Sequence, residues 1–214
     1  MYFLTGCIGI TVTFHRYLAH HSYESPKWFQ IFGSICGSLG GTGSPIGWRG
    51  VHIEHHKYSD HQGDPHSPVT RGWRLFLTSY PFNLNKFAIR NMITDPFQRF
   101  MHEYYILILL LWGILLLSIS VNVFLFAFIV PIAIQITFSN ISNYYNHHYH
   151  WGCYRTHQTN DESYNSTWLG LLTWGEGLGH NKHHAEPWNP NYGGNRWWEI
   201  DPSFWIIQLV RTDK

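Results

Sequence analysis

The sequence predicts an all-α membrane protein, with a transmembrane helical hairpin, an N-terminal membrane helix and a cytosolic helical cap that carries clustered histidines. Three observations favour this fold class. Charged residues are only 13% of the 214 residues, whereas aromatic residues are 18%, and Trp and Tyr collect at membrane interfaces. Residues 104–141 are almost free of charge. Sixteen histidines lie mostly in tight clusters, and imidazole is the commonest metal ligand in proteins.

The first segment, residues 1–14, is apolar and runs directly into a histidine cluster. It has no basic start and no small-residue cleavage site, so it does not match a signal peptide. We expect a membrane helix that the chain enters part-way along. Residues 31–46 are also apolar but rich in Gly and Ser, which favours an interfacial or re-entrant segment over a full span.

The long apolar stretch predicts the hairpin. Residues 104–141 exceed the roughly 20 residues of one span and fit two helices, with a polar turn at residues 118–122. Pro131 in the second helix is tolerated inside a bundle. The alternative is a soluble protein with a buried helical hairpin.

Charge placement predicts the orientation. The basic residues lie before and after the predicted hairpin and are absent from its turn. The positive-inside rule then places every histidine cluster on the cytosolic face, at the endoplasmic reticulum of a eukaryote or the inner membrane of a bacterium. The near balance of 14 basic and 13 acidic residues gives no reason to expect nucleic acid as a partner. Cys7, Cys36 and Cys153 lack metal-site spacing and are expected to be free thiols.

The histidine spacing predicts shared helix faces, because residues at i, i+3 and i+4 lie together on an α-helix. His52, His55 and His56 should then form one three-ligand set, and His180, His183 and His184 another. Asn146 and His150 also share a face. His15 and His20 are five apart and can converge only if the helix ends or loosens between Tyr17 and His20.

These nine histidines and one amide are too many for one ion, and the count predicts two metal ions with four or five nitrogens each. Imidazole suits iron, copper, zinc and nickel alike, so the ligand type alone does not choose the metal. A metal-transport pathway is the alternative, but transporters place ionisable ligands within the membrane, whereas these clusters flank it.

The order of the boxes, H-x4-H, then H-x2-H-H, then a hydrophobic hairpin, then H-x2-H-H, resembles the integral-membrane fatty acyl desaturases, and most resembles the stearoyl-CoA (delta-9) desaturase type. The likeness covers nearly the whole chain. It includes the following further motifs: Gly9-Ile10-Thr11, Trp48, Asp64-Pro65-His66, Gly175-Glu176-Gly177 and Trp197-Trp198-Glu199-Ile200-Asp201. The chain departs from the family pattern at Ile53, where Arg is usual, and at the extra Gly179. The resemblance implies a single desaturase domain over residues 1–214, without the family's first membrane helix.

The resemblance also implies a site. Two iron ions, with O2 as co-substrate, would be held by these ligands: His15, His20, His52, His55, His56, Asn146, His150, His180, His183 and His184. Asn143 and His147 are the alternative to Asn146 and His150 for one ligand pair. No further catalytic side chain is implied. Glu54, Glu176 and Asp64 would orient imidazoles, Trp48 would line the acyl tunnel, and His66 is expected to be loop structure.

The implied reaction inserts a cis double bond, of the delta-9 type, into a saturated acyl chain. The substrate would be an acyl-CoA or a lipid-linked chain, and the two electrons would come from a separate donor such as cytochrome b5 or ferredoxin. The acyl carrier, the regiochemistry, the chain length, the donor and the oligomeric state stay open. The alternatives are a related diiron membrane hydroxylase, a non-enzymatic metal-binding or transport protein, and a truncated desaturase without activity. The hydroxylases usually open with H-x3-H, whereas His15 and His20 form H-x4-H.

Overall fold

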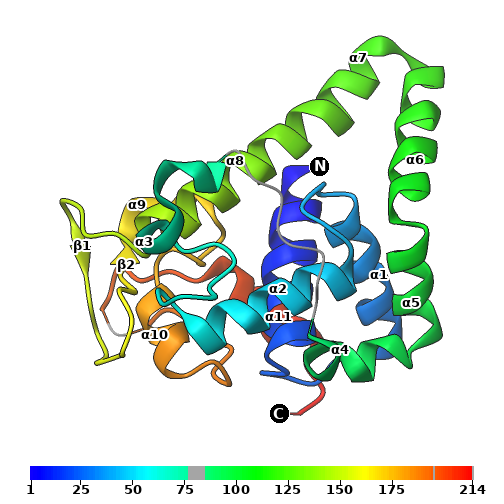
Figure 1. Ribbon diagram of the computed structural model, residues 1–214. Helices are drawn as coiled ribbons and strands as arrows, with labels where there is room; N and C mark the ends of the chain where they lie inside the picture. Colours follow the sequence, from blue (N-terminus) through cyan, green and yellow to red (C-terminus); the bar gives the residue numbers. More distant parts are fainter. Residues whose placement is uncertain (77–84, 195, 214) are drawn as a thin grey trace.

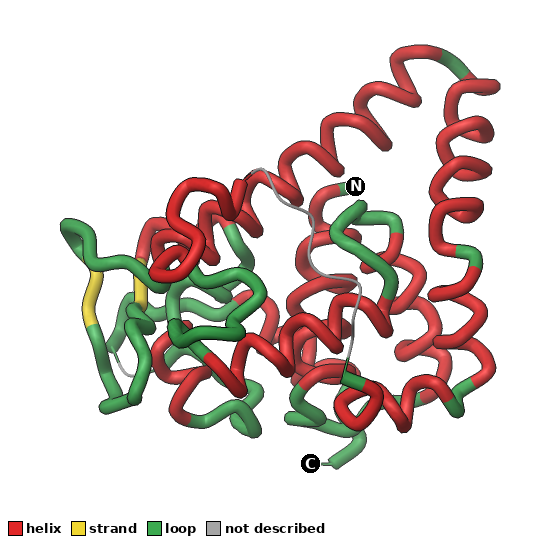
Figure 2. The backbone as a smooth tube through the Cα atoms, in the orientation of Figure 1, coloured by secondary structure: helices red, strands yellow, loops and turns green. Residues whose placement is uncertain are grey.

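The computed structural model describes residues 1–76, 85–194 and 196–213. Most of these residues are helical, as the sequence predicts, and Figures 1 and 2 show a helical body from which two long helices rise to a common tip. The elements of the first half are η1 (Phe3–Ala19), α1 (Lys27–Ser38), α2 (Pro45–Tyr58), α3 (Pro68–Arg71), η2 (Gly72–Phe76), α4 (Lys86–Ile93) and α5 (Pro96–Glu103). Those of the second half are α6 (Tyr105–Ile119), α7 (Val121–Phe124), η3 (Leu125–Ile129), α8 (Val130–Tyr145), β1 (Cys153–Tyr154), β2 (Asn165–Ser166), α9 (Thr167–Leu172), α10 (His180–Ala185) and α11 (Pro202–Val210).

The first helix, η1, is the centre of the body and is wound as a π-helix. Almost every side chain from Thr5 to Ala19 is buried, because α1, α2 and α11 all pack against it. Glycines allow the closest of these approaches. A Cβ added at Gly9 would collide with the backbone of Gly37 in α1, and one added at Gly33 would collide with Thr13. Small residues four apart on α1 therefore bring its backbone against η1.

Helix α2 carries His52, His55 and His56, and its start is well defined. The Ser44 hydroxyl accepts a hydrogen bond from the Gly47 backbone N–H at 3.2 Å, and Pro45 occupies the first helical position. The helix crosses η1 and continues to Tyr58. Its apolar contacts with η1 and α4 include Ile46, Phe14 and Ile89. The N-terminal part of α2 is thus fixed by packing, which holds the direction of the histidines at its other end.

Two long helical stretches occupy the apolar region of the chain. α6 ends at Ile119, the chain turns at Ser120 within the expected interval 118–122, and α7, η3 and α8 continue as one long helical stretch (Figure 1). Val121–Tyr145 is long and apolar enough to cross a membrane, and α5 with α6 would make a second such span if this pair, bent by 70°, is counted as one. Leu110, Ile114 and Phe126 are among the apolar side chains exposed on these helices.

The C-terminal third contains a short antiparallel strand pair that the sequence did not predict. Cys153 and Tyr154 of β1 pair with Ser166 and Asn165 of β2. The segment between the strands folds back onto α10, where the Asn181 side chain accepts hydrogen bonds from the backbone N–H groups of Thr156 and His157, both at 2.8 Å. The strand pair and these two hydrogen bonds hold the loop against α10, which carries His180, His183 and His184.

Candidate metal centre

Histidines from four separated stretches meet in two clusters. Within each cluster, the atoms that could bind a metal all lie within 4.8 Å of one another. The first cluster consists of His15, His20, His52, His56 and His183. The second cluster consists of His55, His147, His180 and His184. The two clusters adjoin, since the rings of His56 and His184 stack with their centroids 4.4 Å apart.

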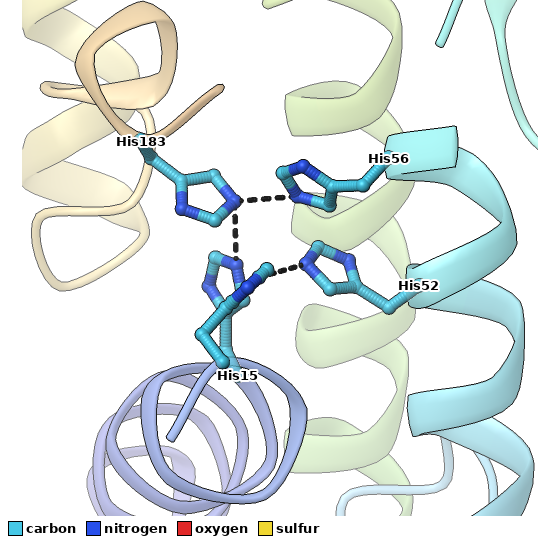
Figure 3. A group of neighbouring side chains, drawn as sticks. His15, His52, His56 and His183 are labelled. Carbon is cyan, nitrogen blue, oxygen red and sulfur yellow. Dashed lines mark hydrogen bonds between the residues drawn. The ribbon is translucent and has the colours of Figure 1, made fainter. Parts of the chain in front are cut away.

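In the first cluster, the Nε2 atoms point at one another (Figure 3). His183 Nε2 lies 2.9 Å from that of His15 and 2.8 Å from that of His56. His20 Nε2 lies 2.7 Å from that of His52. Neutral imidazole has one lone pair for a cation, so nitrogens converging in a buried space fit a metal better than they fit one another.

The second cluster has the same character. His180 Nε2 lies 2.8 Å from His147 Nε2. His184 Nε2 is buried without a hydrogen-bond partner. An unpaired buried nitrogen costs free energy unless something binds it, so this atom also supports the fit to a metal.

Neighbouring histidines on one helix serve different clusters, which differs from the expected three-ligand sets. His52 and His56, four apart on α2, join the first cluster, whereas His55 turns to the second. On α10 the pattern is reversed, because His180 and His184 join the second cluster and His183 joins the first. Adjacent residues on an α-helix point about 100° apart, so a broad histidine face is wide enough to be divided between two sites.

The π-winding of η1 explains how His15 and His20 meet. The His20 backbone N–H donates to the His15 carbonyl at 3.2 Å, which is the i→i+5 bond of a π-helix. Side chains five residues apart then lie one above the other, and the two rings have centroids 5.1 Å apart. The required loosening of the helix is therefore present, and it extends along the whole of η1.

Outer nitrogens of several imidazoles are hydrogen-bonded. Four Nδ1 atoms face carboxylates, in the pairs His15–Glu176 at 2.5 Å, His55–Asp64 at 2.9 Å, His147–Asp60 at 2.8 Å and His184–Asp161 at 2.7 Å. His183 Nδ1 lies 2.8 Å from the Tyr192 hydroxyl. A carboxylate only accepts, so it keeps the proton on Nδ1 and leaves the Nε2 lone pair facing the cluster. This is the usual arrangement around metal-binding histidines.

Burial sets the protonation of these groups. It lowers the pKa of His52, His55 and His183 well below the usual histidine value, and neighbouring imidazoles lower it further. Burial alone would raise the pKa of Asp161, but the hydrogen bond and charge of His184 outweigh it and lower that pKa. Burial raises the pKa of Glu176 to about 8, against the opposing charge of Arg16. Neutral imidazoles are the form that binds metal.

One of the expected ligands, His150, lies elsewhere. His150 lies outside both clusters, with its Nδ1 2.9 Å from the carbonyl of Trp151 and its ring against Tyr145 and Trp168. α8 ends at Tyr145, so the i, i+4 relation that joined Asn146 to His150 does not hold beyond it. His147 occupies the place in the second cluster. Asn146 is fully buried: its amide nitrogen donates to the Ser142 hydroxyl, and its Oδ1 has no hydrogen-bond partner among the described residues, so its expected role stays a prediction.

The other singled-out residues have definite places. Trp48 is half-buried and stacks on His52, with the ring centroids 4.8 Å apart, so it borders the first cluster. His66 is buried against His55. Glu54 accepts a hydrogen bond from Asn85 instead of from a histidine. Sequence reasoning missed Asp60, Asp161 and Tyr192 as histidine partners. No spacing pattern marks them, because each comes from a loop that only the fold brings to the clusters.

Comparison with known proteins identifies the family. The model of the fatty acid desaturase family matches residues 1–208. The chain is 33% identical, over 222 residues, to an sn-1 stearoyl-lipid 9-desaturase of Anabaena variabilis, with 99% of this chain and 78% of the relative covered. It is 33% identical over 217 residues to an sn-1 stearoyl-lipid 9-desaturase of Synechocystis sp., covering 98% of this chain and 66% of the relative.

A third relative has a different regiochemistry in its name. The chain is 32% identical, over 223 residues, to a chloroplastic palmitoyl-monogalactosyldiacylglycerol delta-7 desaturase of Arabidopsis thaliana, with 99% of this chain and 58% of the relative covered. The family match over nearly the whole chain agrees with the two histidine clusters and with the sequence motifs. The chain belongs to the fatty acid desaturase family, whose members are oxidoreductases that act on acyl chains.

Proposed function

We propose that this protein is an O2-dependent acyl-lipid desaturase that inserts a cis double bond at the delta-9 position of a saturated acyl chain. The observation that carries the proposal is the pair of adjoining, all-imidazole clusters. Soluble diiron bundles use carboxylate-rich ligand sets instead. The names of the first two relatives favour position 9 and a lipid-linked substrate.

The proposed ligands form two sets. His15, His20, His52, His56 and His183 would hold one iron, and His55, His147, His180 and His184 would hold the other. An unactivated C–H bond offers no acidity for acid–base catalysis, so bound iron would supply the oxidising chemistry, in which O2, two electrons and two protons take up the two hydrogens of the acyl chain and leave as two water molecules. A transport role is less well supported, because nine nitrogens divided into two adjoining sets do not form a path.

The tasks of the protein's own residues follow from their positions. Glu176, Asp64, Asp60 and Asp161 hold four imidazoles in one orientation through their outer nitrogens. Trp48 lies over His52 and would place one wall of the acyl chain's path beside the first cluster. Burial of the imidazoles excludes water from the space where an oxidant forms. No side chain is required as a nucleophile or proton donor.

The membrane arrangement is part of the proposal. η1 and the two long stretches around Ser120 would cross the bilayer, with the clusters on the cytosolic side. Two features support it: the apolar side chains of α6 and α8 are exposed, and Val121–Tyr145 has the length of a span. A separate electron donor, such as cytochrome b5 or ferredoxin, would approach from the same side.

Expression in a desaturase-deficient host tests the function. We expect new monounsaturated acyl chains with the double bond at carbon 9, located by mass spectrometry, and linked to membrane lipid. A His56→Ala variant with the same expression level is the control and should give none. Hydroxylated chains would instead indicate the related hydroxylase, and unchanged lipids with intact, metal-loaded protein would contradict the proposal.

A further inference from the structure

Arg16 follows His15 on η1 and is fully buried. Its guanidinium donates to Asp201 Oδ2 at 2.8 Å, to Glu176 Oε1 at 3.3 Å and to the carbonyl of Pro190 at 2.9 Å. A buried arginine is stable only when its charge is paired and most of its donors are met; both terminal nitrogens of Arg16 are hydrogen-bonded, whereas its Nε has no hydrogen-bond partner among the described residues. None of these contacts is with a histidine, so the metal site described above does not itself explain the residue.

Two of the groups that Arg16 contacts each support a histidine of the first cluster. Glu176 presents its other oxygen, Oε2, to His15 Nδ1. The Tyr192 ring lies beneath the guanidinium, with the carbon of the guanidinium 3.8 Å from the ring centroid, and its hydroxyl lies 2.8 Å from His183 Nδ1. Arg16 thus lies between the outer supports of two imidazoles whose Nε2 atoms are 2.9 Å apart.

Asp201 completes this arrangement from the C-terminal side. Its Oδ2 accepts from both Arg16 and the Tyr192 backbone N–H, while its Oδ1 caps α11 through the Phe204 N–H at 3.0 Å. The position of Tyr192 is therefore fixed twice, by the face of the guanidinium and by the carboxylate that pairs with it.

The second cluster is supported by different groups. Asp60 accepts from the Glu162 backbone N–H at 2.8 Å and from the Ser67 hydroxyl at 2.5 Å. Asp64 accepts from the backbone N–H groups of Asp60 and His66. Loop backbone and hydroxyl groups hold these carboxylates, whereas the support of the first cluster converges on one arginine.

We infer that Arg16 is a positioning residue for the first metal site alone: it fixes Glu176 and Tyr192, and through them the orientation of His15 and His183. The inference rests on the proposed function only in taking the clusters as metal sites. Arginine suits the task because its planar fork binds a carboxylate on each side while its face stacks on an aromatic ring.

The test uses proteins with one site each, purified in detergent and titrated with Co²⁺, whose visible absorption reports imidazole coordination. His180→Ala/His184→Ala leaves two histidines of the second site and so only the first site intact, and His20→Ala/His52→Ala/His56→Ala likewise leaves only the second. Arg16→Gln should weaken Co²⁺ binding about 10- to 100-fold where only the first site remains, the usual loss when a ligand's outer support is removed. It should leave the affinity of the second site unchanged.

Two further variants make the result decisive. Asp64→Asn, which removes a support of His55, should show the opposite pattern and is the matched control. Asp201→Asn contacts Arg16 but no ligand, keeps an oxygen to cap α11, and should weaken the first site only. It decides the question if Arg16→Gln does not fold, as judged by circular dichroism. Equal weakening of both sites, or unchanged affinity at the first site, would overturn the inference. The Co²⁺ affinities of the two sites can be measured whether or not the enzyme makes a double bond.

Discussion

At the scale of single residues, the centre depends on which imidazole nitrogen faces inward. Carboxylates on the outer nitrogens of His15, His55, His147 and His184 settle this point, and Tyr192 has the same position beside His183. Asp64 and Tyr192 each lie nine residues from their histidine, whereas Glu176 and Asp60 lie 161 and 87 residues from theirs. These partners make the clusters rigid before any metal arrives, which lowers the cost of binding.

His147 and His150 give the sharpest prediction at this scale. His147→Ala should remove a ligand of the second cluster and lower the bound metal from two ions per chain to about one, with loss of desaturation. His150→Ala is the matched control, because its ring lies against Tyr145 and Trp168 outside both clusters. Metal analysis of the purified variants measures the difference. The reverse pattern would mean that His150 is the ligand.

This pair also shows what the sequence could and could not predict about single residues. Most of the expected ligands meet, because the boxes H-x4-H and H-x2-H-H are local and their spacing is readable. The family's distance to Tyr154 and Arg155 favoured Asn146 and His150, but the helix that would align this pair ends at Tyr145, and helix ends are the least readable feature of a sequence. Asp64 and Glu176 were expected to orient imidazoles and do so, whereas Asp60 and Asp161 could not be read, since their histidine partners lie 87 and 23 residues away.

At the scale of elements, the contact between η1 and α1 fixes the first histidine box. The glycines of α1 at positions 33 and 37 leave no space between the two backbones, and Phe14 packs over Gly37. Gly9 meets Gly37 backbone to backbone, so there is no flexible side chain that could move aside. The helix that carries His15 and His20 is therefore held at a fixed depth in the body.

Gly9→Ala should for this reason disturb the site from a distance. The added methyl would collide with the Gly37 backbone, and overpacking of this kind usually costs about 1–3 kcal/mol. We expect a lower thermal midpoint and weaker metal binding. Gly47→Ala, in α2, is the control, since its methyl would meet only the Ser44 hydroxyl, at 3.1 Å. A Gly9→Ala protein as stable as the parent would show that the two helices can move apart freely.

The positions of the helices were more predictable than the type of helix that each one forms. The break between the two long helical stretches falls at Ser120, inside the interval where a turn was expected, because a long uncharged stretch with one polar interruption has few other places to break. The apolar start of the chain is a helix, as expected. Its π-winding was visible only as a five-residue spacing that an α-helix could not accommodate. The short β1–β2 pair had no alternating pattern to reveal it.

At the scale of the whole molecule, the buried imidazoles tie stability to pH. Burial lowers the pKa of His55, His180 and His183 in the folded protein, so they stay neutral while the unfolded chain gains protons below pH about 6.5. The unfolded state then binds more protons, and the free energy of unfolding falls as the pH falls. Each such group contributes up to about 1.4 kcal/mol per pH unit.

Acidification should therefore destabilise the metal-free protein steeply. We expect denaturant midpoints that drop between pH 6.5 and 5, with bound metal lost over the same range in the loaded protein. Chemical denaturation in detergent at several pH values measures the first, and metal analysis after dialysis the second. A midpoint that stays constant down to pH 5 would mean that these imidazoles are protonated or solvated in the folded state.

His55 and His56 are neighbours in the chain but belong to different clusters, and the same holds for His183 and His184. Consecutive Cα atoms are about 3.8 Å apart, so covalent bonds in two separate chain segments limit the distance between the two clusters and would limit the distance between the two proposed ions. Neither position can be adjusted independently, and a variant that shifts α2 or α10 changes both ions together. Redesign of one half of this centre for another metal would thus have to rebuild its neighbour as well.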